Sequence, residues 1–138
     1  AIFGLSTLGV TVTLVGPATL MPAEVERLGC AVAGSVDEAM EGADAVMALR
    51  IQRERMEAGL LPSLSEYTRA WGIDAARVRR MKPDAVVLHP GPVNRGVELA
   101  PDVADGERSV ILDQVANGVA VRCAVLRRCA GALAREAA

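Results

Sequence analysis

The segment Ala85-Val-Val-Leu-His-Pro-Gly-Pro-Val-Asn-Arg-Gly-Val-Glu98 carries the clearest sign of the fold. Its first four residues are all apolar, which is typical of a strand buried on both faces of a parallel sheet. The residues that follow include two prolines and two glycines, which restrict the backbone to an unusual path. They also include the only histidine of the chain, an amide, an arginine and a carboxylate. The segment therefore predicts a buried strand that ends in a rigid, polar binding loop.

Similar apolar runs occur at residues 11–15, 31–33 and 45–49. These runs alternate with segments of helical periodicity, a pattern typical of strand and helix units around a parallel sheet. Each run is apolar on both faces, as expected for strands that helices cover on both sides. The sequence therefore predicts an α/β fold with three layers and a doubly wound, mostly parallel sheet.

Helix start signals precede four predicted helices, at Pro22, Ser35, Ser65 and Asp74. Proline is favoured at the first helical position, and Ser or Asp side chains cap the first turn. The first of these helices is expected to end at Gly29, the third at Gly72 and the fourth at Met81. The spacing over residues 113–134 predicts a long C-terminal helix. Residues 1–8 look like the second half of a helix, which suggests that the chain begins partway through a fold.

The size and composition fit one soluble domain over residues 1–138 with an aliphatic core. Apolar residues make up 51% of the chain, although only one Phe, one Tyr and one Trp occur. A net charge of −2 gives no electrostatic case for binding nucleic acid or an anionic membrane, and no apolar run could span a bilayer. The cysteines lack CxxC spacing, so neither disulfides nor a zinc site is indicated, and Cys123 and Cys129 are expected to pack within the last helix. A cytoplasmic location is expected.

A second polar segment, Arg50-Ile-Gln-Arg-Glu-Arg55, directly follows the predicted strand 45–49. Ligands of open parallel sheets bind beyond the carboxyl ends of the strands, where this segment and residues 89–98 would both lie. Arg50 and Gln52 are two residues apart, so in extended backbone they point to the same side. A guanidinium and an amide together suit a small dicarboxylate or an amino acid. The alternative is a solvated charged loop with local ion pairs.

The chemistry expected at residues 89–92 comes from the backbone. Pro90 and Pro92 have no N–H group, so the exposed backbone groups are mostly carbonyls, which bind N–H donors such as a carbamoyl NH2. His89 fits a structural hydrogen-bonding role better than a catalytic one. Sequence motifs for dinucleotide, nucleotide-phosphate, zinc or serine-nucleophile chemistry are absent. We therefore expect no metal, no cofactor and no covalent catalysis, and we identify no catalytic side chain.

Four segments of the chain resemble the C-terminal, aspartate-binding domain of the aspartate carbamoyltransferase family. They are residues 50–55, 62–72, 89–98 and 114–122, in the family's order and spacing. Ornithine carbamoyltransferases share the fold but carry a His-Cys-Leu-Pro run where this chain has His-Pro-Gly-Pro. The resemblance implies a Rossmann-like domain. It also implies carbamoyl transfer from carbamoyl phosphate to L-aspartate, the committed step of pyrimidine biosynthesis, without a cofactor.

The resemblance also implies roles for individual residues. Arg50 would hold an aspartate carboxylate, and Gln52 would help to orient the substrate. The carbonyls of Pro90 and Gly91 would accept hydrogen bonds from the carbamoyl NH2, with Pro92 completing the bend. The supporting residues would be Glu54 and Arg55, which hold the Arg50 loop by ion pairs, His89, and the loop-fixing residues Asn94, Arg95 and Glu98.

Parts of the family's site have no counterpart in this sequence. The domain that binds carbamoyl phosphate is absent, and so is the first strand of the aspartate domain, which lies centrally in the sheet. The chain would therefore supply half of a site and be inactive alone, and the sheet would have exposed edges or a gap that another segment must fill. The implied partners are both substrates and a homotrimer of the full-length chain, with a regulatory chain or a dihydroorotase left open. Nucleic acid and membranes are not among them.

Two other functions fit part of the sequence. A non-catalytic domain that acts in assembly or in amino-acid binding would keep the same fold. A purely structural scaffold, however, has no need for the pair Arg50 and Gln52. A dinucleotide-binding domain would suit the alternating pattern, but it requires a glycine fingerprint that this sequence lacks.

Overall fold

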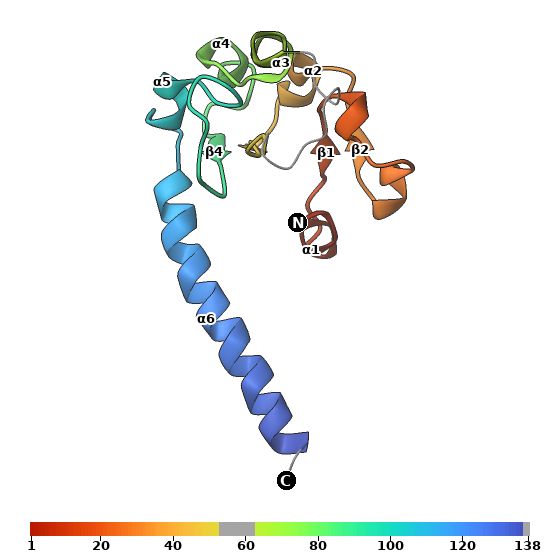
Figure 1. The fold of residues 1–138 in the computed structure, drawn as a ribbon, viewed down its shortest axis with the longest axis vertical. Helices are drawn as coiled ribbons and strands as arrows, with labels where there is room; N and C mark the ends of the chain where they lie inside the picture. Colours follow the sequence, from red (N-terminus) through yellow and green to blue (C-terminus); the bar gives the residue numbers. More distant parts are fainter. Residues whose placement is uncertain (53–62, 137–138) are drawn as a thin grey trace.

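The computed structural model describes residues 1–52 and 63–136 (Figure 1). In chain order the elements are α1 Ile2–Thr7, β1 Thr13–Leu14, the 3-10 helices η1 Ala18–Leu20 and η2 Val25–Leu28, β2 Ala31–Val32, α2 Val36–Met40, β3 Ala45–Met47, α3 Leu64–Trp71, α4 Ala75–Val78, β4 Val86–Leu88, α5 Pro101–Ala104 and α6 Ile111–Glu136. Strands and helices alternate through the middle of the chain, which confirms the predicted α/β class.

The described strands form two parallel pairs. In one pair β1 lies beside β2, with Thr13 opposite Ala31. In the other β3 lies beside β4, with Ala45 opposite Val86. The parallel direction confirms the prediction, but β1 and β3 are not hydrogen-bonded to each other. The strands are also shorter than the apolar runs that predicted them, since each contains two or three residues.

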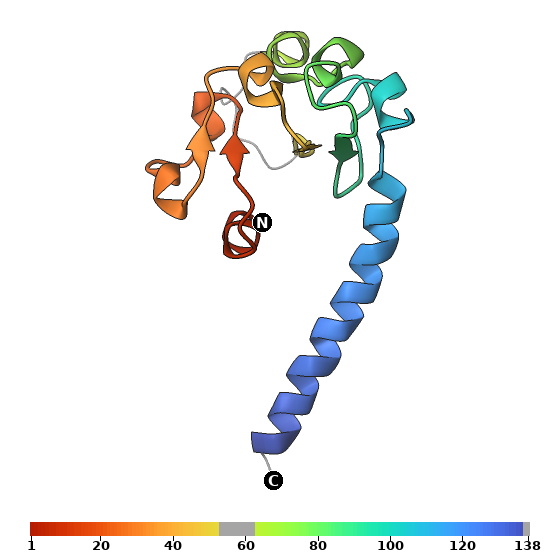
Figure 2. The ribbon, with the colours of Figure 1, turned by 180° about the vertical axis from the view of Figure 1, so that it is seen from behind.

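The helices cover the strands unequally. The helices α2, α3 and α4 lie together on one side of the strands, whereas α6 extends away from the body on the other side (Figures 1 and 2). Among the strands only β4 contains a fully buried residue, Val87, while Val32 in β2 and Met47 in β3 are 40% and 42% exposed. The expectation that helices bury both faces of every strand is therefore wrong for β1, β2 and β3. Val32 and Met47 lie on faces that the described residues leave open, whereas Val46 of β3 packs against the core.

The core lies between β4, α2, α4 and α5. Its most completely buried side chains are Met40, Val87 and Leu99. Each such apolar side chain stabilises the fold by roughly 1.5–3 kcal/mol relative to an exposed one. His89 and Leu99, which are also inaccessible to solvent, bracket the polar segment between them. The core therefore anchors both ends of the predicted binding loop.

Two of the predicted helix caps are present. The Ser35 hydroxyl accepts a hydrogen bond from the Glu38 N–H at 3.2 Å, while the Glu38 carboxylate accepts one from the Gly34 N–H at 2.9 Å. Asp74 accepts a hydrogen bond from the Arg77 N–H at 2.9 Å. These bonds satisfy donors that the first turn of a helix leaves without partners.

The third predicted cap is wrong by two residues. The N-cap of α3 is Ser63, whose hydroxyl accepts a hydrogen bond from the Glu66 N–H at 3.2 Å and donates one to the Glu66 carboxylate at 2.9 Å. Ser65 instead lies inside the first turn. A capping box requires a Ser three residues before a Glu, and only Ser63 meets that spacing here.

Two helices are shorter than predicted, and two others, α1 and α6, agree closely. The helix expected from Pro22 is only the 3-10 helix η2, because Glu24 has a left-handed φ of 56° that interrupts the first turn. It ends as expected at Gly29, whose φ is 81°. The helix α4 ends at Val78 rather than Met81, and α1 spans Ile2–Thr7. The long C-terminal helix is confirmed as α6.

Candidate functional site

The two predicted polar loops meet at the carboxyl edge of the pair β3–β4. The ladder continues past β3 with a hydrogen bond from the Ala48 N–H to the Leu88 carbonyl at 3.0 Å. Arg50 follows and is half-buried, and Gln52 is exposed. Beyond β4, Asn94 Nδ2 donates a hydrogen bond to the Ile51 carbonyl at 3.1 Å. The edge therefore brings the segment of Arg50 and Gln52 against residues 89–98, as the predicted topology requires.

The turn at residues 90–92 presents backbone rather than side chains. Pro90, Gly91 and Pro92 are all exposed, and the Gly91–Pro92 peptide bond is cis. Gly91 has φ of 71°, a conformation that residues with a side chain rarely adopt. Within the described part of the chain we find no hydrogen bond to the carbonyl of Pro90 or Gly91. Neither carbonyl is therefore occupied by a backbone donor of the described residues, and their predicted role in ligand binding stays a prediction.

His89 lies fully buried beneath that turn. Its Nδ1 accepts a hydrogen bond from the Gly91 N–H at 2.9 Å, which assigns the ring proton to Nε2. The Nε2 atom lies 3.2 Å from Glu98 Oε1 and donates to it. The backbone N–H of His89 donates to Gln114 Oε1 at 2.9 Å. With both ring nitrogens bonded to protein, His89 shapes the loop and offers no nitrogen to a substrate.

Glu98 is a buried carboxylate that holds the loop from inside. Its Oε1 accepts hydrogen bonds from His89 and from the Asn94 N–H, the latter at 2.6 Å. Its Oε2 is also buried and has no hydrogen-bond partner among the described residues. The sequence indicated a loop-fixing role for Glu98, but its position between Val97 and Leu99 gave no measure of its burial.

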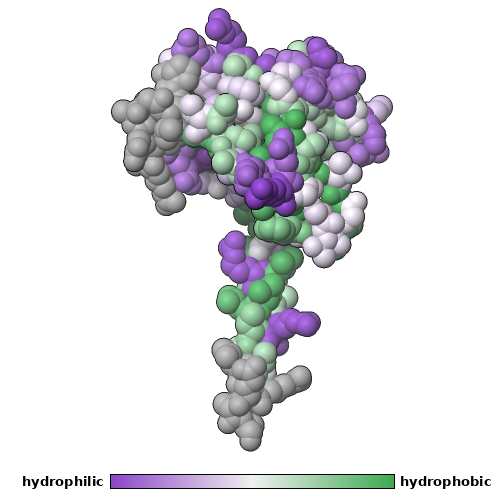
Figure 3. Space-filling model, turned by 90° about the vertical axis from the view of Figure 1, so that its right-hand side faces the viewer, coloured by the Kyte–Doolittle hydropathy of each residue, from purple (hydrophilic) through white to green (hydrophobic). Residues whose placement is uncertain are grey.

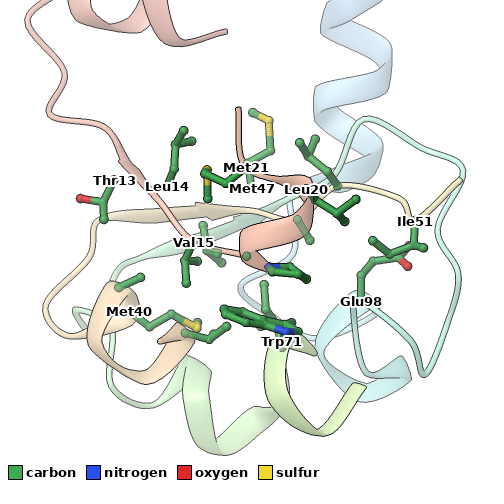
Figure 4. Close-up of a pocket in the computed structure, with 18 of the residues that line it drawn as sticks. Thr13, Leu14, Val15, Leu20, Met21, Met40, Met47, Ile51, Trp71 and Glu98 are labelled. Atoms are coloured by element: carbon green, nitrogen blue, oxygen red, sulfur yellow. The ribbon is translucent and has the colours of Figure 1, made fainter. Parts of the chain in front are cut away.

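A pocket of about 450 Å³ lies between the two strand pairs. Its lining is mostly apolar and comes from both pairs and the helices next to them, including Leu14, Val15, Met40, Met47 and Trp71 (Figure 4). Ile51 and Glu98 lie at one end of it, and Arg50 lines it as well (Figure 4). The pocket therefore separates β1 from β3, and it reaches the candidate site.

Sequence reasoning missed two residues of this pocket, Tyr67 and Trp71. They are four residues apart on α3, so both side chains lie on the face that the helix turns toward the pocket. The i, i+4 spacing of the only Tyr and the only Trp could have identified that face. Gly72, directly after this helix, packs closely, because an added Cβ would lie 2.8 Å from the Val97 carbonyl.

The remaining predictions about side chains have mixed outcomes. Glu54 and Arg55 lie outside the described residues, so their supporting role stays a prediction. Cys30 is buried, but Cys123 and Cys129 are exposed, and the expectation that they pack is wrong because α6 extends away from the body. In the described ranges no group of three or more His, Cys, Asp or Glu side chains could hold a metal ion. Among the same residues, no helix is long and apolar enough to cross a membrane.

Tyr67 is expected to titrate at a higher pH in the folded chain than in the unfolded chain. Burial, and secondarily the charge of Glu98, raise the pKa of Tyr67 to about 12. The neutral phenol is then favoured in the folded state, so its contribution to stability is full below about pH 10 and is lost as the pH rises toward 12. The near-ultraviolet absorbance of tyrosinate, which has a single source in this chain, should rise about two pH units higher in the folded chain than in guanidinium. A midpoint near 10 in the folded chain would contradict this placement.

The chain is thus an α/β domain in which two polar loops meet at the carboxyl edge of parallel strands. The chain belongs to the aspartate/ornithine carbamoyltransferase family, since its residues 1–129 match the family's Asp/Orn binding domain. It is 57% identical over 131 residues to an aspartate carbamoyltransferase catalytic subunit from Anaeromyxobacter sp. (strain K), covering 94% of this chain. It is 59% identical over 125 residues to the one from Myxococcus xanthus, covering 91% of this chain. The chain spans 42% of the length of each of these relatives.

Solved structures agree with this assignment. An aspartate transcarbamoylase from Trypanosoma cruzi, in complex with carbamoyl aspartate and phosphate, is 32% identical with a TM-score of 0.69. The match covers 84% of this chain and 39% of that one. An ornithine carbamoyltransferase from Pyrococcus furiosus has a TM-score of 0.72 at 24% identity, covering 88% of this chain and 42% of that one, and shows the shared fold.

Proposed function

We propose that this chain is the aspartate-binding half of an aspartate carbamoyltransferase. In that reaction the amine of L-aspartate attacks the carbonyl carbon of carbamoyl phosphate. A C–N bond forms, the bond to the phosphate oxygen breaks, and the products are N-carbamoyl-L-aspartate and phosphate, for pyrimidine biosynthesis. The observation that carries the proposal is the junction of two loops at one sheet edge, joined by the bond between Asn94 and Ile51. The names of the most similar relatives support it.

Each loop would bind one of the two substrates. Arg50 would hold a carboxylate of aspartate by a forked, charge-assisted interaction, and Gln52 would orient the same molecule. The carbonyls of Pro90 and Gly91 would accept hydrogen bonds from the carbamoyl NH2, and Pro92 would complete the turn that presents them. Because these groups transfer no proton, the domain would act by positioning the amine near the carbonyl carbon.

The other parts of the active site would come from polypeptide beyond these residues. A domain that binds the phosphate group would face the loops, and residues 1–138 would form the aspartate domain. The apolar pocket between β1 and β3 is consistent with a further strand, because two parallel strands face it and no described backbone fills it. We further propose a cytoplasmic enzyme that assembles as a homotrimer, as the resemblance implies.

The test compares the 138-residue chain with a chimera in which it replaces the matching part of the Anaeromyxobacter catalytic subunit. We expect carbamoyl aspartate to be formed by the chimera and not by the chain alone. Calorimetric titration of the chimera should show aspartate binding that depends on carbamoyl phosphate. A folded chimera that neither turns over nor binds aspartate would instead favour a non-catalytic role. Robust phosphate release by the isolated chain would contradict the proposal that it supplies only half of the active site.

A further inference from the structure

Asn94 connects the two loops of the candidate site through opposite ends of one residue. Its side-chain Nδ2 donates to the Ile51 carbonyl at 3.1 Å. Its backbone N–H donates to Glu98 Oε1 at 2.6 Å. The residue is half-buried, so solvent competes only partly for these bonds. Asn94 therefore holds a fixed position between the end of β3 and the loop that follows β4.

The bond to Ile51 controls how the neighbouring side chains point. Ile51 is buried and lies between Arg50 and Gln52 in the sequence. Its carbonyl belongs to the peptide unit that leads into Gln52. Holding that carbonyl fixes the orientation of this peptide plane, and with it the direction in which Arg50 and Gln52 extend.

The other end of Asn94 rests on a buried set of hydrogen bonds. Glu98 Oε1 accepts from both Asn94 and His89, and His89 in turn accepts from the Gly91 N–H. His89 and Glu98 are only 0% and 2% exposed. A continuous series of four hydrogen bonds thus runs from Gly91 through His89, Glu98 and Asn94 to Ile51. Within this series, His89, Glu98 and Asn94 need not touch a substrate.

We propose that Asn94 is a positioning residue that sets the spacing between the Pro90–Gly91 carbonyls and the pair Arg50 and Gln52. This inference rests on the proposed function, in which the two groups bind the two reactants. The spacing would decide how close the aspartate amine lies to the carbamoyl carbon. Misplacement of reacting groups by about 1 Å costs on the order of 100-fold in rate. The half-buried amide of Asn94, which would contact no substrate, thereby becomes important for turnover.

The test uses the chimera with Asn94→Ala, which removes the side-chain bond and keeps the backbone N–H. We expect kcat/KM for aspartate to fall about 100-fold, while carbamoyl phosphate binds with unchanged affinity, because only the spacing between the loops is altered. Thr68→Val is the matched control, since Thr68 donates to the Gly96 carbonyl in the same loop without reaching Ile51. This control should change kcat/KM less than twofold. If Asn94→Ala does not fold, Asn94→Ser, which keeps a small polar side chain, replaces it.

A double-mutant cycle with Gln52→Ala separates positioning from general support of the structure. If Asn94 acts through Gln52 and Arg50, its removal should cost much less once Gln52 is absent, so the two effects should not add. Additive losses, or equal effects of Asn94→Ala and Thr68→Val, would overturn the inference while leaving the proposed function intact. A folded parent chimera without activity would overturn both.

Discussion

Replacement of Arg50 by alanine in the chimera is expected to lower kcat/KM for aspartate by roughly 1,000-fold. Loss of one partner of a desolvated, charge-assisted pair costs about 4 kcal/mol, and each 1.4 kcal/mol corresponds to a factor of ten. Arg50 is half-buried at the pocket end where the two loops meet, which is the environment in which such a pair is strong. Initial rates measured against aspartate at saturating carbamoyl phosphate give the ratio.

Two further variants make that result specific. Arg50→Lys keeps the charge and loses the planar fork, so most of the loss should remain if the ligand is a carboxylate held by two parallel bonds. Arg27→Ala removes an arginine that is exposed and paired with Glu24 at 2.9 Å, far along the chain from the loops. It should leave the rates unchanged. Equal effects of Arg50→Ala and Arg27→Ala would exclude Arg50 from aspartate binding.

Replacement of His89 by alanine is expected to destabilise the fold by about 3–5 kcal/mol, because it removes a fully buried ring and its hydrogen bond to Glu98. Glu98 would keep only the Asn94 N–H on Oε1, and its Oε2 has no hydrogen-bond partner among the described residues. The cavity left by the ring adds to that loss. The midpoint of urea denaturation, compared at equal slopes, measures the change.

The matched control for His89→Ala is Lys82→Ala, which breaks an exposed ion pair with Asp44 and should shift the midpoint little. Combining His89→Ala with Glu98→Gln should recover part of the lost stability, because the buried charge is then removed together with its partner. A midpoint for His89→Ala no lower than that for Lys82→Ala would show that the buried pair contributes little.

The sequence predicted the local elements better than their assembly. Apolar runs, caps at Ser35 and Asp74, and a helical C-terminal segment follow from spacing and side-chain chemistry within a few residues, and all are present. The separation of β1 from β3 depends on contacts between distant segments, which periodicity does not encode. The left-handed backbone at Glu24 similarly shortens a helix that Pro22 and the following residues favour.

For the candidate site, sequence order was sufficient to place both loops at one edge, because parallel neighbours end on the same side of a sheet. The sequence also indicated that the chemistry of this loop comes from the backbone carbonyls of Pro90 and Gly91 and not from the imidazole of His89. The hydrogen bond between Asn94 and Ile51 could not be predicted, since it joins residues that are 43 positions apart. The spacing of Tyr67 and Trp71 marks one face of α3 in the sequence, but not the pocket that this face lines.

The long helix α6 has a mechanical consequence. It has 26 residues, and at 1.5 Å per residue it is roughly 39 Å long. Its first turn contacts the rest of the chain through Gln114, which accepts a hydrogen bond from the backbone N–H of His89. Leu126 is exposed, and apolar surface is visible along the described part of the helix (Figure 3). A rigid rod of that length, tilted by about 5° at its base, moves its far end by roughly 3 Å. The base of the helix therefore lies beside the carbonyl turn, and a spectroscopic label on the exposed Cys129, with the exposed Cys123 replaced, would report a change in the tilt of the helix.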